Sequence, residues 1–128
     1  MPPVIPPMMP KIWLNGALVA PDTARIAPND RGFLLGDGVF DTLCAAPGGL
    51  VDFERHMARL SESAATIGIE NPYTDNELKA ACRTVLDASG LLRTEASLRI
   101  TLTRGPGPRG LLPPADPSPT CLVAAAPA

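Results

Sequence analysis

The fold of this chain is decided by residues 29–43, which read Asn29-Asp30-Arg31-Gly32-Phe33-Leu34-Leu35-Gly36-Asp37-Gly38-Val39-Phe40-Asp41-Thr42-Leu43. This stretch combines three glycines with three aspartates in a segment that is otherwise largely apolar. Glycines at this density permit tight turns and close approach of the backbone, and the apolar side chains argue against a solvated loop. The residues alone leave two interpretations open: a tight β-turn between two strands, or the wall of a binding site.

The residues before this stretch predict a proline-rich leader and a β-hairpin. Residues 1–10 hold five of the sixteen prolines, and we expect them to form an extended leader outside the fold because proline removes backbone donors. Asn15-Gly16 separates the apolar runs 12–14 and 17–19, which is the strongest short-range signal for a hairpin. Residues 25–27 are a candidate short strand that leads into the central stretch.

Two helices are predicted downstream, each with one apolar face. Asp52 is a suitable N-cap for the first helix, which is expected to run from about residue 53 to residue 67. Thr74 and Glu77 have the spacing of a capping box at the start of the second helix, which stops at Gly90. The apolar positions are Phe53, Met57, Leu60, Ala64 and Ile67 in the first helix and Leu78, Ala81, Cys82, Val85 and Leu86 in the second.

Strands are predicted on both sides of the two helices. Residues 40–46 and 50–51 are expected to form two strands around a Pro-Gly-Gly turn, and residues 121–126 a buried strand. Residues 96–103 alternate between apolar and polar side chains, which indicates a half-buried strand. The order of strands, two helices and strands predicts an α+β domain with a mostly antiparallel sheet.

Composition excludes several classes of protein. The 128 residues suit one domain, and 45% hydrophobic against 19% charged residues allow a real core. A net charge of −2 and 4% aromatic residues do not indicate a nucleic-acid binder. No apolar run reaches membrane-spanning length, and residues 1–10 do not resemble a signal peptide. The three cysteines form no CxxC pair, and we expect buried thiols in a reducing cytosol.

A few polar side chains are candidates for chemistry. Arg59 lies on the flank of the first helix, where it either binds an anion or is an ordinary solvated or salt-bridged arginine. His56, one turn earlier, has no nucleophile to form a triad and is expected to be structural. Arg99 lies on the polar face of its strand, which is either an ordinary surface open to water or the lining of a cleft. In a cleft, Arg99 or the loop arginines Arg104 and Arg109 would bind a carboxylate bidentately. The acidic residues do not cluster with histidine at metal-ligand spacing.

Several motifs in order resemble those of the class IV (fold-type IV) pyridoxal-phosphate enzymes. The segment from Asp30 to Thr42 resembles the signature near the N-terminus of this family, which includes branched-chain and D-amino acid aminotransferases and aminodeoxychorismate lyase. Trp13-Leu14-Asn15-Gly16 resembles the family's first hairpin, and His56-Met57-Ala58-Arg59-Leu60 its cofactor helix. Thr103-Arg104-Gly105 and Arg109-Gly110 resemble the strand end and loop that face the substrate. The resemblance covers residues 11–126.

This resemblance implies roles for particular residues. It implies the family's small N-terminal domain, with two helices packed on one side of the sheet, and pyridoxal 5′-phosphate as cofactor, its phosphate bound by Arg59. It makes Phe40 a wall of the substrate pocket and places Arg104 and Arg109 on the substrate-facing loop, with Arg109 as the candidate for the substrate carboxylate. Arg99 becomes less favoured as a direct ligand. Amino acids and 2-oxo acids are the implied substrates, and a cytoplasmic homodimer the implied form.

The sequence departs from the family pattern in its lysines. The family uses a lysine that forms a Schiff base with the cofactor and a glutamate that pairs with the pyridine nitrogen, both in a second, C-terminal domain. The only lysines here are Lys11 and Lys79, and neither lies at the family position. We therefore expect residues 11–128 to be the small domain alone, inactive by itself. Alternatives are aminodeoxychorismate lyase, which performs a β-elimination on the same scaffold, and a non-catalytic dimerising domain.

Overall fold

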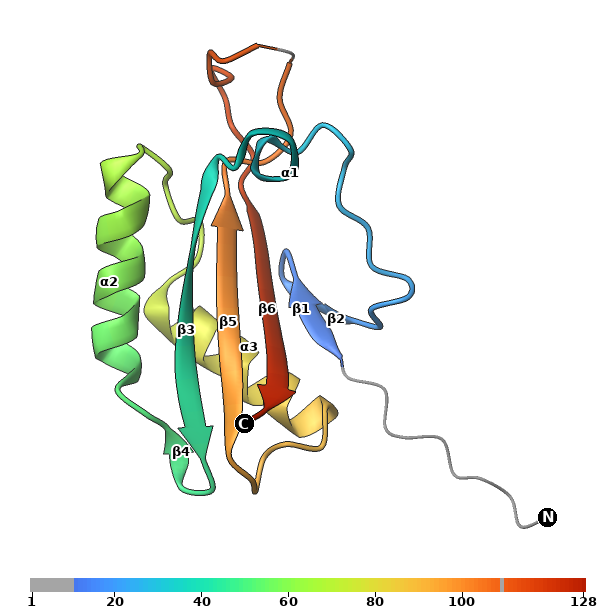
Figure 1. Ribbon diagram of the computed structural model, residues 1–128, viewed down its shortest axis with the longest axis vertical. Helices are drawn as coiled ribbons and strands as arrows, with labels where there is room; N and C mark the ends of the chain where they lie inside the picture. The colour runs from blue at the N-terminus through green and yellow to red at the C-terminus, as the bar shows by residue number, and fades with distance from the viewer. Residues whose placement is uncertain (1–10, 109) are drawn as a thin grey trace, which may run out of the picture.

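An antiparallel sheet covered on one face by two long helices makes up the computed structural model, which describes residues 11–108 and 110–128 (Figure 1). Within those residues the sheet has six strands in the order β2-β1-β6-β5-β3-β4, and every neighbouring pair is antiparallel. The strands are β1 (Ile12–Leu14), β2 (Ala17–Val19), β3 (Gly38–Ala46), β4 (Gly49–Leu50), β5 (Ala96–Thr103) and β6 (Thr120–Pro127). The predicted α+β fold is confirmed.

The N-terminal hairpin forms as predicted. Strands β1 and β2 pair in register Leu14↔Ala17, and the two turn residues Asn15 and Gly16 both have positive φ, 51° and 97°, which suits the right-handed twist of the strands. Residues 25–27 are not a strand, so that part of the prediction is wrong. The predicted leader, residues 1–10, lies outside the described residues.

The two long helices lie on the same face of the sheet, with α2 (Phe53–Thr66) against β3 and α3 (Asp75–Ala88) against β6 and β1 (Figure 1). The capping box of α3 is confirmed: Thr74 Oγ1 accepts from the backbone N–H of Glu77 at 3.1 Å, and Glu77 Oε1 accepts from that of Thr74 at 3.0 Å. Asp52 is the N-cap of α2, but its side chain makes no capping hydrogen bond and its φ is 52°.

The core lies between the sheet and these helices. Strand β5 alternates between apolar and polar side chains, as predicted, and its apolar side chains point toward the helices. Leu98, Ile100 and Leu102 have no exposed surface, and burial of each such side chain contributes about 1.5–3 kcal/mol. The odd-numbered residues of β5 point to the opposite face, which the two helices leave open. Cys44 of β3 is exposed because it lies on that open face, so the prediction that all three thiols are buried is wrong.

The central stretch is not a tight β-turn, because it contains a short helix, α1 (Arg31–Leu35), before β3 begins. Asp30 caps this helix by accepting from the backbone N–H of Gly32 at 2.8 Å, and Gly36 ends it with φ of 67°. A side chain at Gly32 would overlap Thr103 of β5. Glycine is therefore needed where α1 is pressed against the end of the sheet.

Candidate functional site

Arg59 and Asp41 form a two-point ion pair between α2 and β3. Arg59 donates from Nε to Asp41 Oδ2 at 2.7 Å and from Nη2 to Asp41 Oδ1 at 2.9 Å. The carboxyl side chain is 3% exposed whereas the arginine side chain is 65% exposed. The Arg59 hydrogen bonds hold the pKa of Asp41 below its usual range against the opposing effect of burial. Asp41 is therefore a fixed anion at neutral pH, and it holds an otherwise open guanidinium in place.

His56 supports the same carboxylate from one helical turn away. Its Nδ1 lies 2.7 Å from Asp41 Oδ1, and because an ionised carboxylate only accepts, Nδ1 must carry a proton. This contact occupies Nδ1 and leaves Nε2 available for a further partner. The sequence prediction of a hydrogen-bonded structural histidine is confirmed by this geometry, and its partner is a residue that the sequence did not single out.

The Arg59 guanidinium keeps donors for a further anion. Nε and one N–H of Nη2 serve Asp41, whereas Nη1 has no partner among residues 11–108 and 110–128. Nη2 also lies 3.4 Å from His56 Nδ1, which cannot accept from it because that nitrogen carries the proton donated to Asp41. Arg55 and His56 line a surface groove of about 470 Å³ together with Arg59. Both carboxylates and phosphates match the two-point geometry of a planar guanidinium, so the open edge of Arg59 could bind either kind of anion.

A second group of candidate residues lies on the open face of the sheet. Phe40 is 57% exposed, and the guanidinium carbon of Arg99 lies 3.9 Å from its ring centroid, as in a cation–π contact. Among the described residues Arg99 has no carboxylate partner. The pair therefore offers an aromatic wall next to a positive charge, on the face opposite to the one that buries Asp41.

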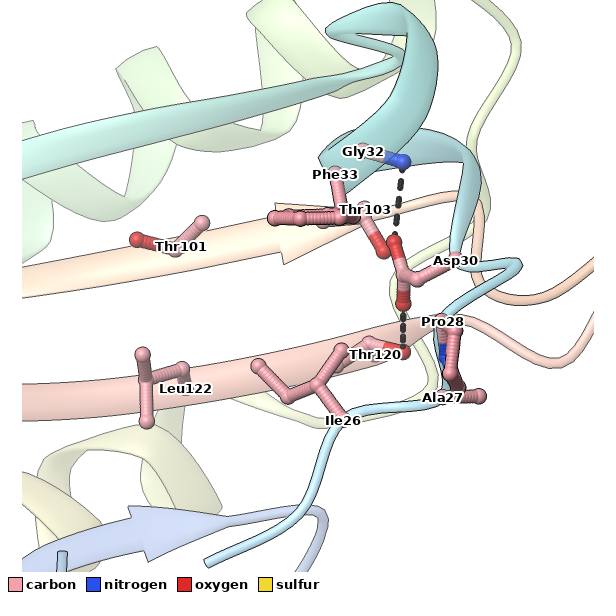
Figure 2. Close-up of a pocket in the computed structure, with 10 residues that line it drawn as sticks. All are labelled: Ile26, Ala27, Pro28, Asp30, Gly32, Phe33, Thr101, Thr103, Thr120 and Leu122. Atoms are coloured by element: carbon pink, nitrogen blue, oxygen red, sulfur yellow. Dashed lines mark hydrogen bonds between the residues drawn. The ribbon is translucent and has the colours of Figure 1, made fainter.

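A pocket of about 620 Å³ lies on the same open face, between α1 and the ends of β5 and β6 (Figure 2). Its lining is mostly apolar. The residues are Ile26, Ala27, Pro28, Asp30, Gly32, Phe33, Thr101, Thr103, Thr120 and Leu122. Figure 2 shows that its buried carboxylate, Asp30, is already satisfied, because it accepts from the backbone of Gly32 and from Thr120 Oγ1, the latter at 2.6 Å. The pocket thus offers apolar surface and threonine side chains but no free charge.

Arg104 is held by a second carboxylate, Asp37, at the start of β3. It donates to Asp37 from Nε at 2.7 Å and from Nη2 at 3.1 Å, and also to the carbonyls of Ile67 and Gly68. Arg31 shares Asp37 at 2.9 Å. The Arg104 hydrogen bond is the largest of the effects that hold the pKa of Asp37 below its ordinary value. We call Arg31, Asp37 and Arg104 the aspartate clasp.

The clasp holds the loop that the sequence assigned to the substrate. Arg31 donates from Nη1 and Nη2 to the backbone carbonyls of Gly110 and Leu111, each at 3.0 Å. The side chain of Arg104, predicted as a substrate contact, is only 12% exposed and is directed to the clasp and to the end of α2. Arg109, the other predicted contact, lies outside the described residues.

Sequence reasoning missed Asp37 and Asp41 as organisers of the site. One signal was available for Asp41: it shares strand parity with Leu43 and Ala45, so alternation places its carboxylate on the buried face of β3. A buried carboxylate needs a cationic or hydrogen-bonding partner, and α2 supplies one. Asp37 gave no comparable signal, because its two-point partner, Arg104, lies 67 positions further along the chain and only Arg31, six positions before it, is near in sequence.

Two further expectations concern metals and membranes. Within the described part of the chain, no group of three or more histidine, cysteine or acidic residues could hold a metal ion. No helix in residues 11–108 and 110–128 has the length and apolar character to cross a membrane. Lys79 of α3, one of the two lysines, pairs with Glu54 of α2 at 3.4 Å.

Comparison with known proteins gives consistent matches. A family model described as amino-transferase class IV matches residues 38–128. A D-alanine aminotransferase of Bacillus licheniformis is 34% identical over 99 residues, which are 77% of this chain and 34% of that protein. A putative branched-chain-amino-acid aminotransferase of Methanocaldococcus jannaschii is 35% identical over 117 residues, 91% of this chain and 40% of that one. The chain thus spans 34–40% of the length of these two relatives.

Solved structures share the fold. The branched-chain amino acid aminotransferase from Escherichia coli superposes with a TM-score of 0.85 at 28% identity, covering 93% of this chain and 41% of that one. A branched-chain amino acid aminotransferase from T.th., solved with pyridoxamine 5′-phosphate, gives 0.81 at 25% identity, covering 91% and 40%. The 4-amino-4-deoxychorismate lyase from Pseudomonas aeruginosa gives 0.67 at 34% identity, covering 91% and 39%.

Proposed function

The chain belongs to the class IV aminotransferase family, and on that premise we propose that it forms the small-domain side of a pyridoxal 5′-phosphate site that transfers amino groups between amino acids and 2-oxo acids. The observation that supports this most is the Arg59 fork, anchored by Asp41 yet 65% exposed. It lies in the motif that resembles the family's cofactor helix. When bound, the cofactor supplies the electron sink for the transfer.

The donor set of Arg59 fits a phosphate group. Two N–H bonds on the edge of the guanidinium away from Asp41 match two phosphate oxygens, which is the bidentate recognition that arginine provides and lysine does not. Arg59 is accordingly assigned to hold the cofactor phosphate. A relative of the same fold was solved with pyridoxamine 5′-phosphate, which supports a cofactor of this kind.

The open face of the sheet is assigned to the substrate. Phe40 would form an apolar wall, and Arg99 stacked on its ring at 3.9 Å would attract a substrate carboxylate. Arg109 remains our proposal for a carboxylate contact from the loop. Arg104 is assigned an indirect role, because most of its donors hold Asp37 and the end of α2; in that role it fixes the base of the loop rather than touching substrate.

We assign the Schiff-base lysine to a second domain, so these 128 residues are proposed to be inactive alone. Lys79 is paired with Glu54, and Lys11 precedes the first strand. Catalysis would then need protein made from the full reading frame that encodes this segment. Mixing the isolated chain with pyridoxal 5′-phosphate, an amino acid and a 2-oxo acid should give no turnover. Sustained 2-oxo acid formation by the isolated chain would contradict this part of the proposal.

The activity is tested on protein from the full reading frame. We expect amino transfer from D-alanine or from branched-chain amino acids to 2-oxoglutarate, followed by coupled assay of the 2-oxo acid product. In the Arg59→Gln variant the concentration of pyridoxal 5′-phosphate needed for half-maximal activity should rise at least tenfold, because the bidentate phosphate contact is lost. A variant that needs no more cofactor than wild type would refute the assignment of Arg59.

Aminodeoxychorismate lyase is the second candidate function. The lyase from Pseudomonas aeruginosa is 34% identical to this chain, as close in sequence as the transaminase relatives. The same full-length protein would then release 4-aminobenzoate and pyruvate from 4-amino-4-deoxychorismate. Lyase turnover without amino transfer would select this candidate over the first.

A homodimer is proposed from the exposed apolar side chains near the loop. Phe33, Leu111 and Leu112 are 77%, 83% and 83% exposed, and large apolar side chains exposed in this way favour association. A monomer by sedimentation velocity at 100 µM, with no binding of phosphate ligands, would count against both the dimer and the non-catalytic dimerising alternative. A cytoplasmic location stays a prediction that rests on the free thiols.

A further inference from the structure

We propose that Asp41 is a positioning residue for the phosphate: its carboxylate fixes the Arg59 guanidinium so that the Nη1/Nη2 edge faces outward as a ready two-point donor. This inference rests on the proposed function of Arg59 and adds a residue to it. Asp41 itself touches neither cofactor nor substrate in this scheme. It acts only through the arginine and, together with His56, forms the support behind it.

Asp41 occupies one of the two open edges of the Arg59 guanidinium. A guanidinium has a side edge, formed by Nε and Nη2, and an end edge, formed by Nη1 and Nη2. Asp41 takes the side edge at 2.7 and 2.9 Å. Since the group is planar and rigid, occupying one edge with a fixed anion determines where the other edge points. An exposed arginine without this pair would sample many rotamers.

Asp41 can orient Arg59 because its own carboxylate is buried and fixed. A surface ion pair between two mobile side chains orients neither of them. Here the carboxyl side chain is 3% exposed and sits on the buried face of β3, and His56 donates to its Oδ1 at 2.7 Å. The carboxylate is therefore immobile. Through its two hydrogen bonds it fixes the orientation of the Arg59 guanidinium, although the arginine side chain is 65% exposed. The helix alone could not do this through four rotatable side-chain bonds.

Charge and geometry predict opposite effects for the same substitution. If Asp41 acted only as a charge, Asp41→Asn would remove repulsion toward a phosphate and tighten binding. If Asp41 positions Arg59, the substitution frees the guanidinium, and the phosphate must then order it. Ordering one such side chain weakens binding about 2- to 10-fold. Salt screens the buried Asp41 less than an exposed charge, but any charge effect that remains at 0.5 M NaCl would only tighten binding, so weaker binding must come from the lost positioning of Arg59.

The experiment follows the Arg59 Nε–H signal by ¹⁵N NMR in the full 128-residue chain. The probe is 4-deoxypyridoxine 5′-phosphate, which lacks the aldehyde and cannot react with lysines; 4-deoxypyridoxine is the phosphate-free control. The variants are Asp41→Asn, Arg59→Gln and Asp52→Asn. Asp52→Asn is the matched control because it removes a negative charge that lines the same groove as Arg59 but makes no hydrogen bond to it. Asparagine also tolerates the left-handed backbone at this position.

We expect Asp41→Asn to weaken binding 2- to 10-fold at 0.5 M NaCl and to speed hydrogen exchange of the Arg59 Nε–H at least tenfold. Asp52→Asn should leave both unchanged. Equal or tighter binding in Asp41→Asn would overturn the inference. A second readout needs no variant: in wild type the Nε–H of Arg59 should exchange at least tenfold more slowly than that of Arg55, an exposed arginine on the same helix; equal rates would also overturn it.

The two proposals fail in different ways. If Arg59→Gln binds the probe as well as wild type, the assignment of Arg59 to the phosphate is wrong. If Arg59→Gln loses affinity while Asp41→Asn keeps it, the phosphate assignment stands and only the positioning role of Asp41 is wrong.

Discussion

Replacing Asp37 by asparagine tests the aspartate clasp, on which the position of the substrate-facing loop depends. Asp37 accepts three hydrogen bonds, one from Arg31 and two from Arg104, at 2.7–3.1 Å. The arginine side chains are only 6% and 12% exposed. Asp37→Asn therefore leaves two largely buried cations without their anion, while the shape of the side chain hardly changes.

The expected loss of stability is about 3 kcal/mol. Breaking a buried ion pair costs about 3–5 kcal/mol because the remaining charge stays desolvated. The lower end applies because both arginines keep backbone carbonyl partners, from 110–112 and from the end of α2. For a chain of this length that loss corresponds to a fall in Tm of roughly 10 °C.

Urea unfolding at pH 7, followed by circular dichroism, measures this loss. Urea is preferred to guanidinium chloride because it does not screen the ion pair. Asp22→Asn is the matched control: it removes an exposed aspartate and should change the free energy of unfolding by less than about 0.5 kcal/mol. A loss below about 1 kcal/mol in Asp37→Asn would refute the view that the clasp is a buried, mutually dependent ion pair.

The pH dependence gives a further check with a defined sign. The pKa of Asp37 is lowered in the folded state, chiefly by the hydrogen bond from Arg104. A carboxyl with a lowered folded pKa contributes stability above its unfolded pKa, near 4, and loses that contribution as pH falls through the folded value. The stability gap between wild type and Asp37→Asn should thus be constant above about pH 5 and narrow below about pH 4. A gap that widened in acid would contradict the assignment.

Two smaller predictions concern a loop glycine and the thiols. Gly105→Ala should unfold the protein or cost more than about 2 kcal/mol in urea, because its φ is +88° and a Cβ would overlap a backbone carbonyl across the loop; Gly48→Ala, where a Cβ meets open space, should change stability by less than about 0.5 kcal/mol. Burial raises the pKa of Cys82 and Cys121 to about 12, whereas Cys44 is exposed. Ellman's reagent at pH 8 should therefore react rapidly with one thiol in the native protein and with three in urea. Three rapidly reacting thiols in the native state would be inconsistent with this core.

Local patterns in the sequence determined most of the secondary structure. Alternation in residues 96–103, the Asn15-Gly16 turn and the capping box at Thr74 each depend on residues close together in the chain, and each was found where predicted. The order of the motifs along the chain likewise indicated the family. Local signals suffice here because hairpin turns, helix caps and strand alternation are decided by neighbours within a few positions.

The structure of residues 29–43 depends on contacts with residues far away in the sequence, which local patterns do not predict. Their glycines were consistent with a turn, yet they form a capped helix because Asp30 is held from the other end of the chain by Thr120. The clasp joins residues separated by 67 positions, and Arg59 meets Asp41 across 18 positions.

Only the tertiary structure decided which arginine is free to bind an anion. The sequence offered Arg59, Arg99, Arg104 and Arg109 as similar cations, and their roles depend on where the carboxylates lie in space. Arg104 is largely occupied by Asp37, whereas Arg59 is held on one edge by Asp41 and open on the other. The physical reason is that a buried carboxylate must be neutralised by whichever cation the fold brings to it, and sequence spacing does not reveal that cation.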